Sequence, residues 1–179
     1  HQAVLPAIGL VKKIDFFIQD RPFDLKVTYL PEGYLSKDRQ GEERRPELTL
    51  LKKAARKLEI PFDPDLPSSK LLEDLWLKMD DHPSPEASEL IGELKDFRNS
   101  VVDSLKENPL DLLKWLYENQ GARRFDASNR LFLVIVDKSD YHNAWKLKRA
   151  KPLLVDAIHS FLDRLDDNIG HDVEFNWEG

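Results

Sequence analysis

The chain has 179 residues, enough for one domain, and its lack of cysteine excludes disulfides, thiolate metal sites and a cysteine nucleophile. Hydrophobic residues make up 41% of the sequence, which supports a real core, and no apolar run approaches the length of a membrane span. The net charge of −6 excludes a uniformly basic nucleic-acid binder. We expect a cytoplasmic, helix-rich protein without membrane contact.

The first predicted element is a β-hairpin. Two runs rich in β-branched and aromatic residues, 14–18 and 23–29, flank a turn cluster at 19–22. A loop of the two central residues of this cluster, or of all four, pairs Ile18 with Phe23. Slipping the register by one residue would put Asp15 among the apolar side chains, so the sequence predicts a well-determined register.

In that register Asp15 lies opposite Lys26, and the hairpin has one polar and one apolar face. The polar side chains that share a face are Asp15, Asp24, Lys26 and Thr28. The apolar face carries Leu25, Val27 and Tyr29, which suit a core.

The middle of the chain predicts a polar surface loop followed by four helices. Residues 29–45 lack periodicity and contain Pro31, Gly33 and Gly41, which are typical of loops. The helices are marked by apolar residues at helical spacing. They run from Pro46 through Leu58, from a cap at Ser68 or Ser69 through Met79, after Pro85 through Leu105, and from Asn108-Pro109 to a C-cap at Gly121.

The last third predicts a strand, a helix and a short strand. Residues 130–137 include a continuous apolar run, which indicates a strand buried on both faces beside the Asp24–Lys26 strand. A helix is predicted over 144–166, and residues 172–177 are a candidate edge strand.

Residues 121–151 are locally basic, with eight Lys or Arg against three Asp, and such a surface on an acidic chain is able to bind phosphates. The alternative is a solvated face whose cations pair with acidic neighbours. The residues expected to contact nucleic acid are Arg123, Arg124, Arg130, Lys138, Lys146, Lys148 and Arg149.

The polar hairpin face carries residue types suited to phosphoryl chemistry. Asp15 and Asp24 offer the oxygen ligands that Mg²⁺ or Mn²⁺ takes, and Lys26 is placed to orient a water or stabilise the transition state. The alternative is a solvated face with an ordinary Asp15–Lys26 pair, worth about 0.2–1 kcal/mol. An acidic-x-Lys tripeptide alone carries little weight, because a second one, 93–95, lies in a predicted helix.

An Asp followed, after eight residues, by Asp-x-Lys on a hairpin resembles the PD-(D/E)xK nuclease superfamily, which includes restriction endonucleases and Holliday-junction resolvases. The resemblance implies that Asp15, Asp24 and Lys26 are catalytic. It also implies that Asp15, Asp24 and the Leu25 carbonyl bind Mg²⁺ or Mn²⁺. The chain departs from the family at residues 1–14, which contain no acidic residue where the family usually has a glutamate on a helix.

The resemblance further implies a fold and a function. We expect one α/β domain over 1–179, a restriction-endonuclease-like mixed sheet flanked by helices, with a helical insertion at 46–120 after the catalytic hairpin. The expected activity is Mg²⁺-dependent hydrolysis of double-stranded DNA, similar to type II restriction enzymes, by a homodimer. The alternative is a non-catalytic nucleic-acid-binding or protein-interaction module of the same fold, which the lack of an upstream glutamate favours.

Overall fold

The computed structural model describes residues 4–6, 14–18, 20–119 and 129–163. The chain divides into two compact units. The first, called the sheet unit, comprises residues 1–30, 109–137 and 143–179, and the second, called the helical unit, comprises 31–108 and 138–142. The bounds of the helical unit therefore differ from the expected insertion at 46–120. The predicted C-cap Gly121, the basic loop residues Arg123 and Arg124, and the edge strand at 172–177 lie outside the described residues.

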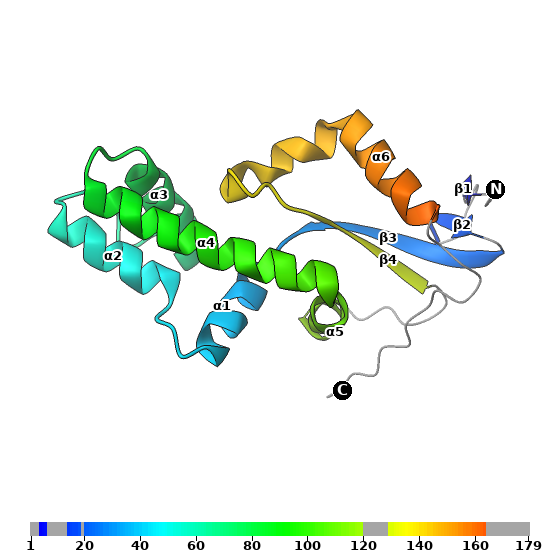
Figure 1. Cartoon of the computed structure of the whole chain (residues 1–179), viewed down its shortest axis with the longest axis horizontal. Helices are drawn as coiled ribbons and strands as arrows, with labels where there is room; N and C mark the ends of the chain where they lie inside the picture. Colours follow the sequence, from blue (N-terminus) through cyan, green and yellow to red (C-terminus); the bar gives the residue numbers. More distant parts are fainter. Residues whose placement is uncertain (1–3, 7–13, 19, 120–128, 164–179) are drawn as a thin grey trace. The chain divides into compact units, whose positions relative to one another are not determined.

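The sheet unit contains a mixed sheet, so the expected α/β class is confirmed. Its described strands, in spatial order, are β1 (Val4–Pro6), β2 (Phe16–Ile18), β3 (Arg21–Tyr29) and β4 (Asn129–Ile135). The pairs β1–β2 and β2–β3 are antiparallel. The strands β3 and β4 run parallel and lie side by side in Figure 1. The strand at 129–135 thus lies beside the Asp24–Lys26 strand, as predicted.

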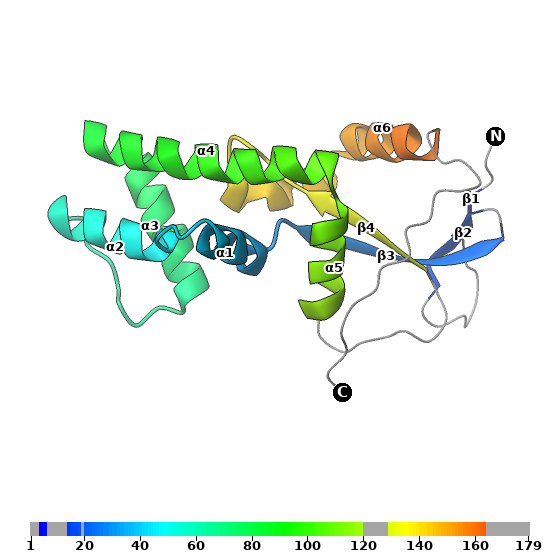
Figure 2. The same ribbon diagram turned by 60° about the horizontal axis from the view of Figure 1, so that its bottom comes forward.

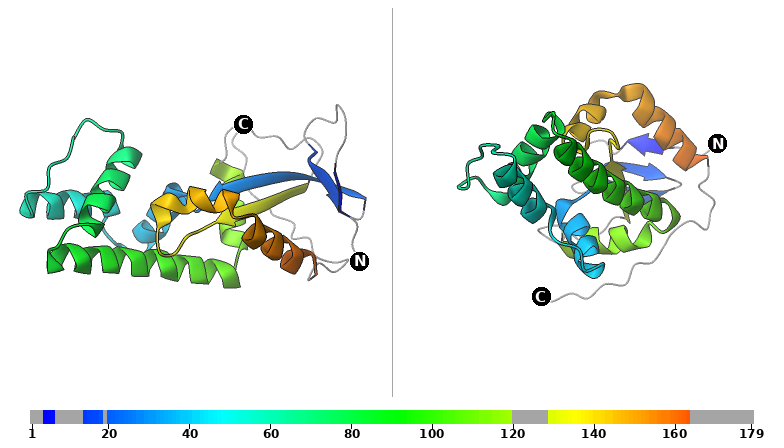
Figure 3. Two further views of the ribbon diagram at one scale, coloured as in Figure 1. Left: turned by 90° about the horizontal axis from the view of Figure 1, so that it is seen from above. Right: turned by 60° about the vertical axis from the view of Figure 1, so that its left-hand side comes forward.

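Helices lie on both sides of the β3–β4 pair. The helix α5 (Leu110–Asn119) lies on one side and α6 (Lys151–Leu162) on the other (Figures 1 and 3). A 3₁₀ helix, η1 (Tyr141–Arg149), precedes α6. The single helix predicted over 144–166 is therefore wrong in its first part. Pro152 lies in the first turn of α6, where its missing N–H costs nothing, so the α-helix begins beside it.

The strand β4 is less buried than its continuous apolar run predicts. Only Ile135 is fully buried, and Leu131 to Val134 are half-buried. Two features explain why β4 is less buried than predicted. Among the described strands, β4 is the last in the sheet order, and α6 on its side contributes no fully buried residue.

The helical unit consists of four α-helices among its described residues. They are α1 (Glu32–Gly41), α2 (Glu47–Lys57), α3 (Ser68–Asp80) and α4 (Pro85–Glu107). The three helices predicted over 46–105 are thereby confirmed, and α3 packs against both α2 and α4 (Figure 2). The predicted serine cap of α3 is wrong, because Pro67 occupies the N-cap position and Ser68 is already helical.

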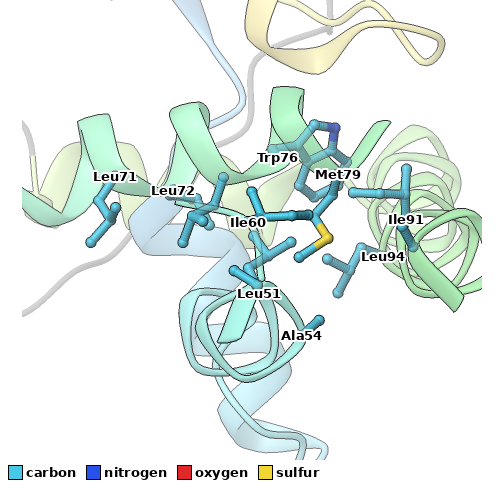
Figure 4. Close-up of a cluster of buried hydrophobic side chains, with 12 residues drawn as sticks. Leu51, Ala54, Ile60, Leu71, Leu72, Trp76, Met79, Ile91 and Leu94 are labelled. Atoms are coloured by element: carbon cyan, nitrogen blue, oxygen red, sulfur yellow. The ribbon is translucent and has the colours of Figure 1, made fainter. Parts of the chain in front are cut away.

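The core of the helical unit comes from the apolar stripes of α2, α3 and α4, and Figure 4 shows its side chains meeting. Leu51 points from α2, Leu75 and Met79 from α3, and Leu94 from α4, and each is fully buried. In the described part of the chain, no helix combines the length and the apolar character needed to cross a membrane.

The helix α1 replaces the predicted polar loop at 29–45. The residues that suggested a loop stand where a helix tolerates them, because Pro31 is the N-cap and Gly41 is the last helical residue. Tyr34 and Leu35 are buried, and so is Arg39, whose guanidinium lies 4.6 Å from the centre of the Phe97 ring. Because a buried arginine interrupts the helical spacing of apolar residues, this helix could not be recognised from the sequence pattern.

Candidate functional site

The hairpin turns one residue earlier than predicted. Its two-residue loop includes Asp20, whose φ of 65° is the left-handed conformation that tight hairpin loops require and that Asp tolerates. Ile18 therefore pairs with Arg21 and not with Phe23, and Phe23 pairs with Phe16. This two-residue shift corrects the register. An even shift leaves every side chain on its predicted face, as the stacked rings of Phe16 and Phe23, 5.7 Å apart, confirm.

Asp15 lies immediately before β2 and forms hydrogen bonds to β3 at that end of the hairpin. Its backbone N–H donates to the Phe23 carbonyl at 2.8 Å, and its side-chain oxygen Oδ2 accepts the Leu25 N–H at 2.7 Å. The Asp15 carboxylate thus stands beside the residue that follows Asp24. The two carboxylates predicted to act together are therefore held at neighbouring backbone positions, although Asp15 does not face Lys26 as expected.

Asp24 has two cationic partners. Lys26 Nζ lies 3.1 Å from each of its carboxylate oxygens, and Arg130 Nε lies 3.6 Å from Oδ2. The parallel register of β3 and β4 causes the second contact, because it places Arg130 level with Asp24 on the same face. The Asp24 side chain is 13% exposed and that of Arg130 only 7%, whereas Lys26 is 39% exposed. Lys26 is therefore the partner that reaches solvent.

Tyr117, on α5, also lies near Asp24 and Arg130. Its ring lies 5.6 Å from the Arg130 guanidinium carbon and packs edge-on against Phe132 at 5.5 Å. Burial raises the pKa of Tyr117, and the charge of Asp24 adds to that rise while Arg130 opposes it. Tyr117 is thus a neutral phenol at physiological pH. No motif pointed to it, because its contact depends on how α5 packs on β4.

Two of the predicted DNA contacts are engaged within the protein. Arg130 turns inward to Asp24, and its expected contact with nucleic acid stays a prediction. Lys138 belongs to the helical unit, where its Nζ lies 2.7 Å from an Asp103 carboxylate oxygen. The ion pair with Lys138, followed by the one with Lys106, lowers the pKa of Asp103.

The cations of η1 are exposed, but they do not share the face of Asp24. The exposed group, called the η1 cations, is Lys146, Lys148 and Arg149. Lys148 Nζ lies 4.6 Å from the centre of the Tyr29 ring. Because Tyr29 is an odd number of residues from Asp24 along β3, the two side chains point to opposite faces of the sheet. The structure therefore places Lys148 on the face opposite Asp24, whereas Arg130 shares the face of Asp24.

The oxygen donors around Asp24 fit a magnesium or manganese ion that keeps several waters. Asp15 and Asp24 supply carboxylates, and the Leu25 C=O points to the same side as its N–H, which is the side of Asp15. Mg²⁺ commonly binds through one or two carboxylates and retains water. Among the described residues, no group of three or more His, Cys, Asp or Glu side chains is placed to hold a metal.

Comparison with protein-family models, with curated proteins and with solved structures finds no match for this chain. The geometry around Asp24 is therefore the basis for inferring a function. It combines two acidic side chains, an exposed lysine and a buried arginine at one end of a hairpin.

Proposed function

We propose that the protein is a divalent-metal-dependent endonuclease that hydrolyses phosphodiester bonds of double-stranded DNA. One observation carries the proposal. Asp15 is hydrogen-bonded to the residue next to Asp24, and Asp24 in turn contacts Lys26, so the acidic, acidic and lysine positions meet on two adjacent strands. This arrangement is similar to the acidic, acidic and lysine pattern of the PD-(D/E)xK nucleases, which supports the proposal.

In the proposed reaction, different residues would bind the metal ion and orient the attacking water. When bound, Mg²⁺ or Mn²⁺ would polarise the phosphate and lower the pKa of a coordinated water. Asp15, Asp24 and the Leu25 carbonyl would hold the ion. Lys26, whose side chain is partly exposed, would orient the attacking water and stabilise charge on the phosphate. Cutting both strands would require two such sites and hence a homodimer.

The test is cleavage of plasmid and genomic DNA with Mg²⁺, with EDTA as the control. We expect Asp24→Asn and Lys26→Gln each to lower the cleavage rate by about 100-fold or more, because each removes a group that stabilises transition-state charge. The chain offers a matched control in Glu93-Leu94-Lys95, the second acidic-x-Lys tripeptide, which lies on α4. Lys95→Gln removes a lysine that is paired with Asp80 at 2.8 Å and should leave cleavage unchanged.

A second candidate function is a non-catalytic nucleic-acid-binding module. It is favoured by the two cations that already neutralise Asp24, and by the separation of the η1 cations from that face. Retention of DNA by a wild-type protein that neither cleaves DNA nor binds Mn²⁺ in calorimetry would decide for this function and against the nuclease.

A further inference from the structure

The contact between Arg130 and Asp24 joins two nearly buried charges at the centre of the candidate site. The Arg130 side chain is 7% exposed, its Nε lies 3.6 Å from Asp24 Oδ2, and its guanidinium stands over the Tyr117 ring. A charge this deeply buried needs a partner, because desolvation is costly for an unpaired ion. Asp24 is one acidic partner of Arg130 in this structure.

That contact conflicts with metal binding. A divalent cation on Asp24 would use the lone pairs that Lys26 and Arg130 now approach, and its charge would repel a guanidinium at such short range. Lys26 is 39% exposed and is able to withdraw toward solvent. Arg130 is confined by Tyr117 and Phe132, which pack beside it, so its displacement has to keep the guanidinium near the site.

We propose that Arg130 competes with the metal ion for Asp24 and, once displaced, becomes the residue that binds the substrate phosphate. The inference rests on the proposed nuclease function. In the metal-free protein Arg130 serves as the counter-ion of Asp24. In the metal-bound protein its planar fork of N–H donors matches a phosphodiester, and Tyr117 keeps the guanidinium stacked beside the same face.

A thermodynamic consequence follows for binding. If metal releases Arg130 toward phosphate, metal raises the affinity for DNA, and DNA raises the affinity for metal by the same factor. Removing Arg130 should therefore change two quantities in opposite directions. Metal affinity in the absence of DNA increases, and the gain in DNA affinity caused by metal decreases.

The first experiment is calorimetric titration of the full chain with Mn²⁺ in the absence of DNA. We expect Arg130→Gln to bind Mn²⁺ about tenfold more tightly than wild type, the size expected when one competing charge-assisted contact is lost. Arg130→Lys keeps the charge and should stay closer to wild type. The matched control is Arg21→Gln, which removes an exposed arginine from the same strand as Asp24 and should leave the Mn²⁺ affinity unchanged.

The second experiment measures binding of a short DNA duplex with and without Ca²⁺, a metal expected to occupy the site without supporting cleavage. Wild type should gain affinity with Ca²⁺, and Arg130→Gln should lose about tenfold of that gain. Equal Mn²⁺ affinity for wild type and Arg130→Gln would overturn the inference while leaving the nuclease proposal intact. Absence of Mn²⁺ binding in wild type would overturn both.

Discussion

At the scale of single residues, Arg98 is the most heavily engaged charge that the structure describes in the helical unit. Its side chain is 1% exposed and forms a paired contact with Glu32, with both N–O distances 2.9 Å. Its Nε donates to Glu47 at 3.2 Å. Burial alone would lower the pKa of Arg98, but the bonds to Glu47 and the charge of Glu32 outweigh burial and raise it. Arg98 thus stays charged and joins α1, α2 and α4.

We predict that Arg98→Met lowers the free energy of unfolding by about 3–5 kcal/mol, because it leaves the buried Glu47 without its main partner. Urea unfolding followed by circular dichroism measures this. Arg44→Met is the control, since Arg44 forms an exposed pair with Glu42 and its loss should cost about 1 kcal/mol or less. Equal costs for the two variants would show that the Arg98 network adds nothing beyond a surface pair.

At the scale of elements, α1 and α2 end in the same way, each with a glutamate in the left-handed conformation. Glu43 has a φ of 56° and Glu59 a φ of 55°. The N–H of Ile60 donates to the Ala55 carbonyl at 2.9 Å, six residues inclusive, which is the Schellman arrangement at a helix C-terminus. The position that Glu59 occupies is usually glycine, because a side chain there costs conformational energy.

We therefore predict that Glu59→Gly raises the free energy of unfolding by about 0.5–1 kcal/mol, since it relieves the left-handed strain. Thermal unfolding monitored by circular dichroism measures this. Glu73→Gly makes the same exchange at an exposed position inside α3 and should instead lower stability by about 1 kcal/mol. If both variants are destabilised alike, the C-terminal conformation of α2 stores no strain.

The elements that sequence reasoning found are those whose apolar stripe is complete. The apolar residues at helical spacing that predicted α3 are all buried, namely Leu71, Leu72, Leu75, Trp76 and Met79. The helix α1 was missed because Arg39 takes a buried position on it. The two faces of the hairpin were predicted correctly, but the pairing register of its strands was not. An alternating pattern repeats every two residues, so it cannot distinguish registers that differ by two residues.

Only the part of the candidate site that lies on the hairpin could be predicted from the sequence. Asp15, Asp24 and Lys26 lie close together in the sequence, so the hairpin pattern alone brought them together. Arg130 and Tyr117 reach Asp24 only through the parallel pairing of β3 with β4 and the packing of α5. Neither the register of a parallel pair nor the rotation of a helix on a sheet is encoded by local spacing.

At the scale of the whole molecule, this acidic chain carries one group of exposed basic residues at η1. Trp145, which is half exposed, directly precedes the η1 cations, and Lys151 follows them after Ala150. These residues belong to the sheet unit, as Asp24 does, and Lys148 contacts Tyr29 on the opposite face of β3. In the proposed nuclease, Lys148 and the cleavage residues would therefore act on different faces of the β3–β4 pair.

The proposed nuclease predicts that the η1 cations determine the salt dependence of DNA binding. Replacing Lys146, Lys148 and Arg149 by Gln should reduce the slope of log affinity against log salt by about 2–3, because each lost phosphate contact contributes about 0.9. Duplex binding measured at several salt concentrations with Ca²⁺ gives the slope. A second triple variant, Lys53, Arg56 and Lys70 to Gln, removes three exposed charges from the helical unit and controls for net charge. If the two triple variants have the same slope, η1 makes no specific phosphate contact, and DNA must approach the face that carries Asp24 directly.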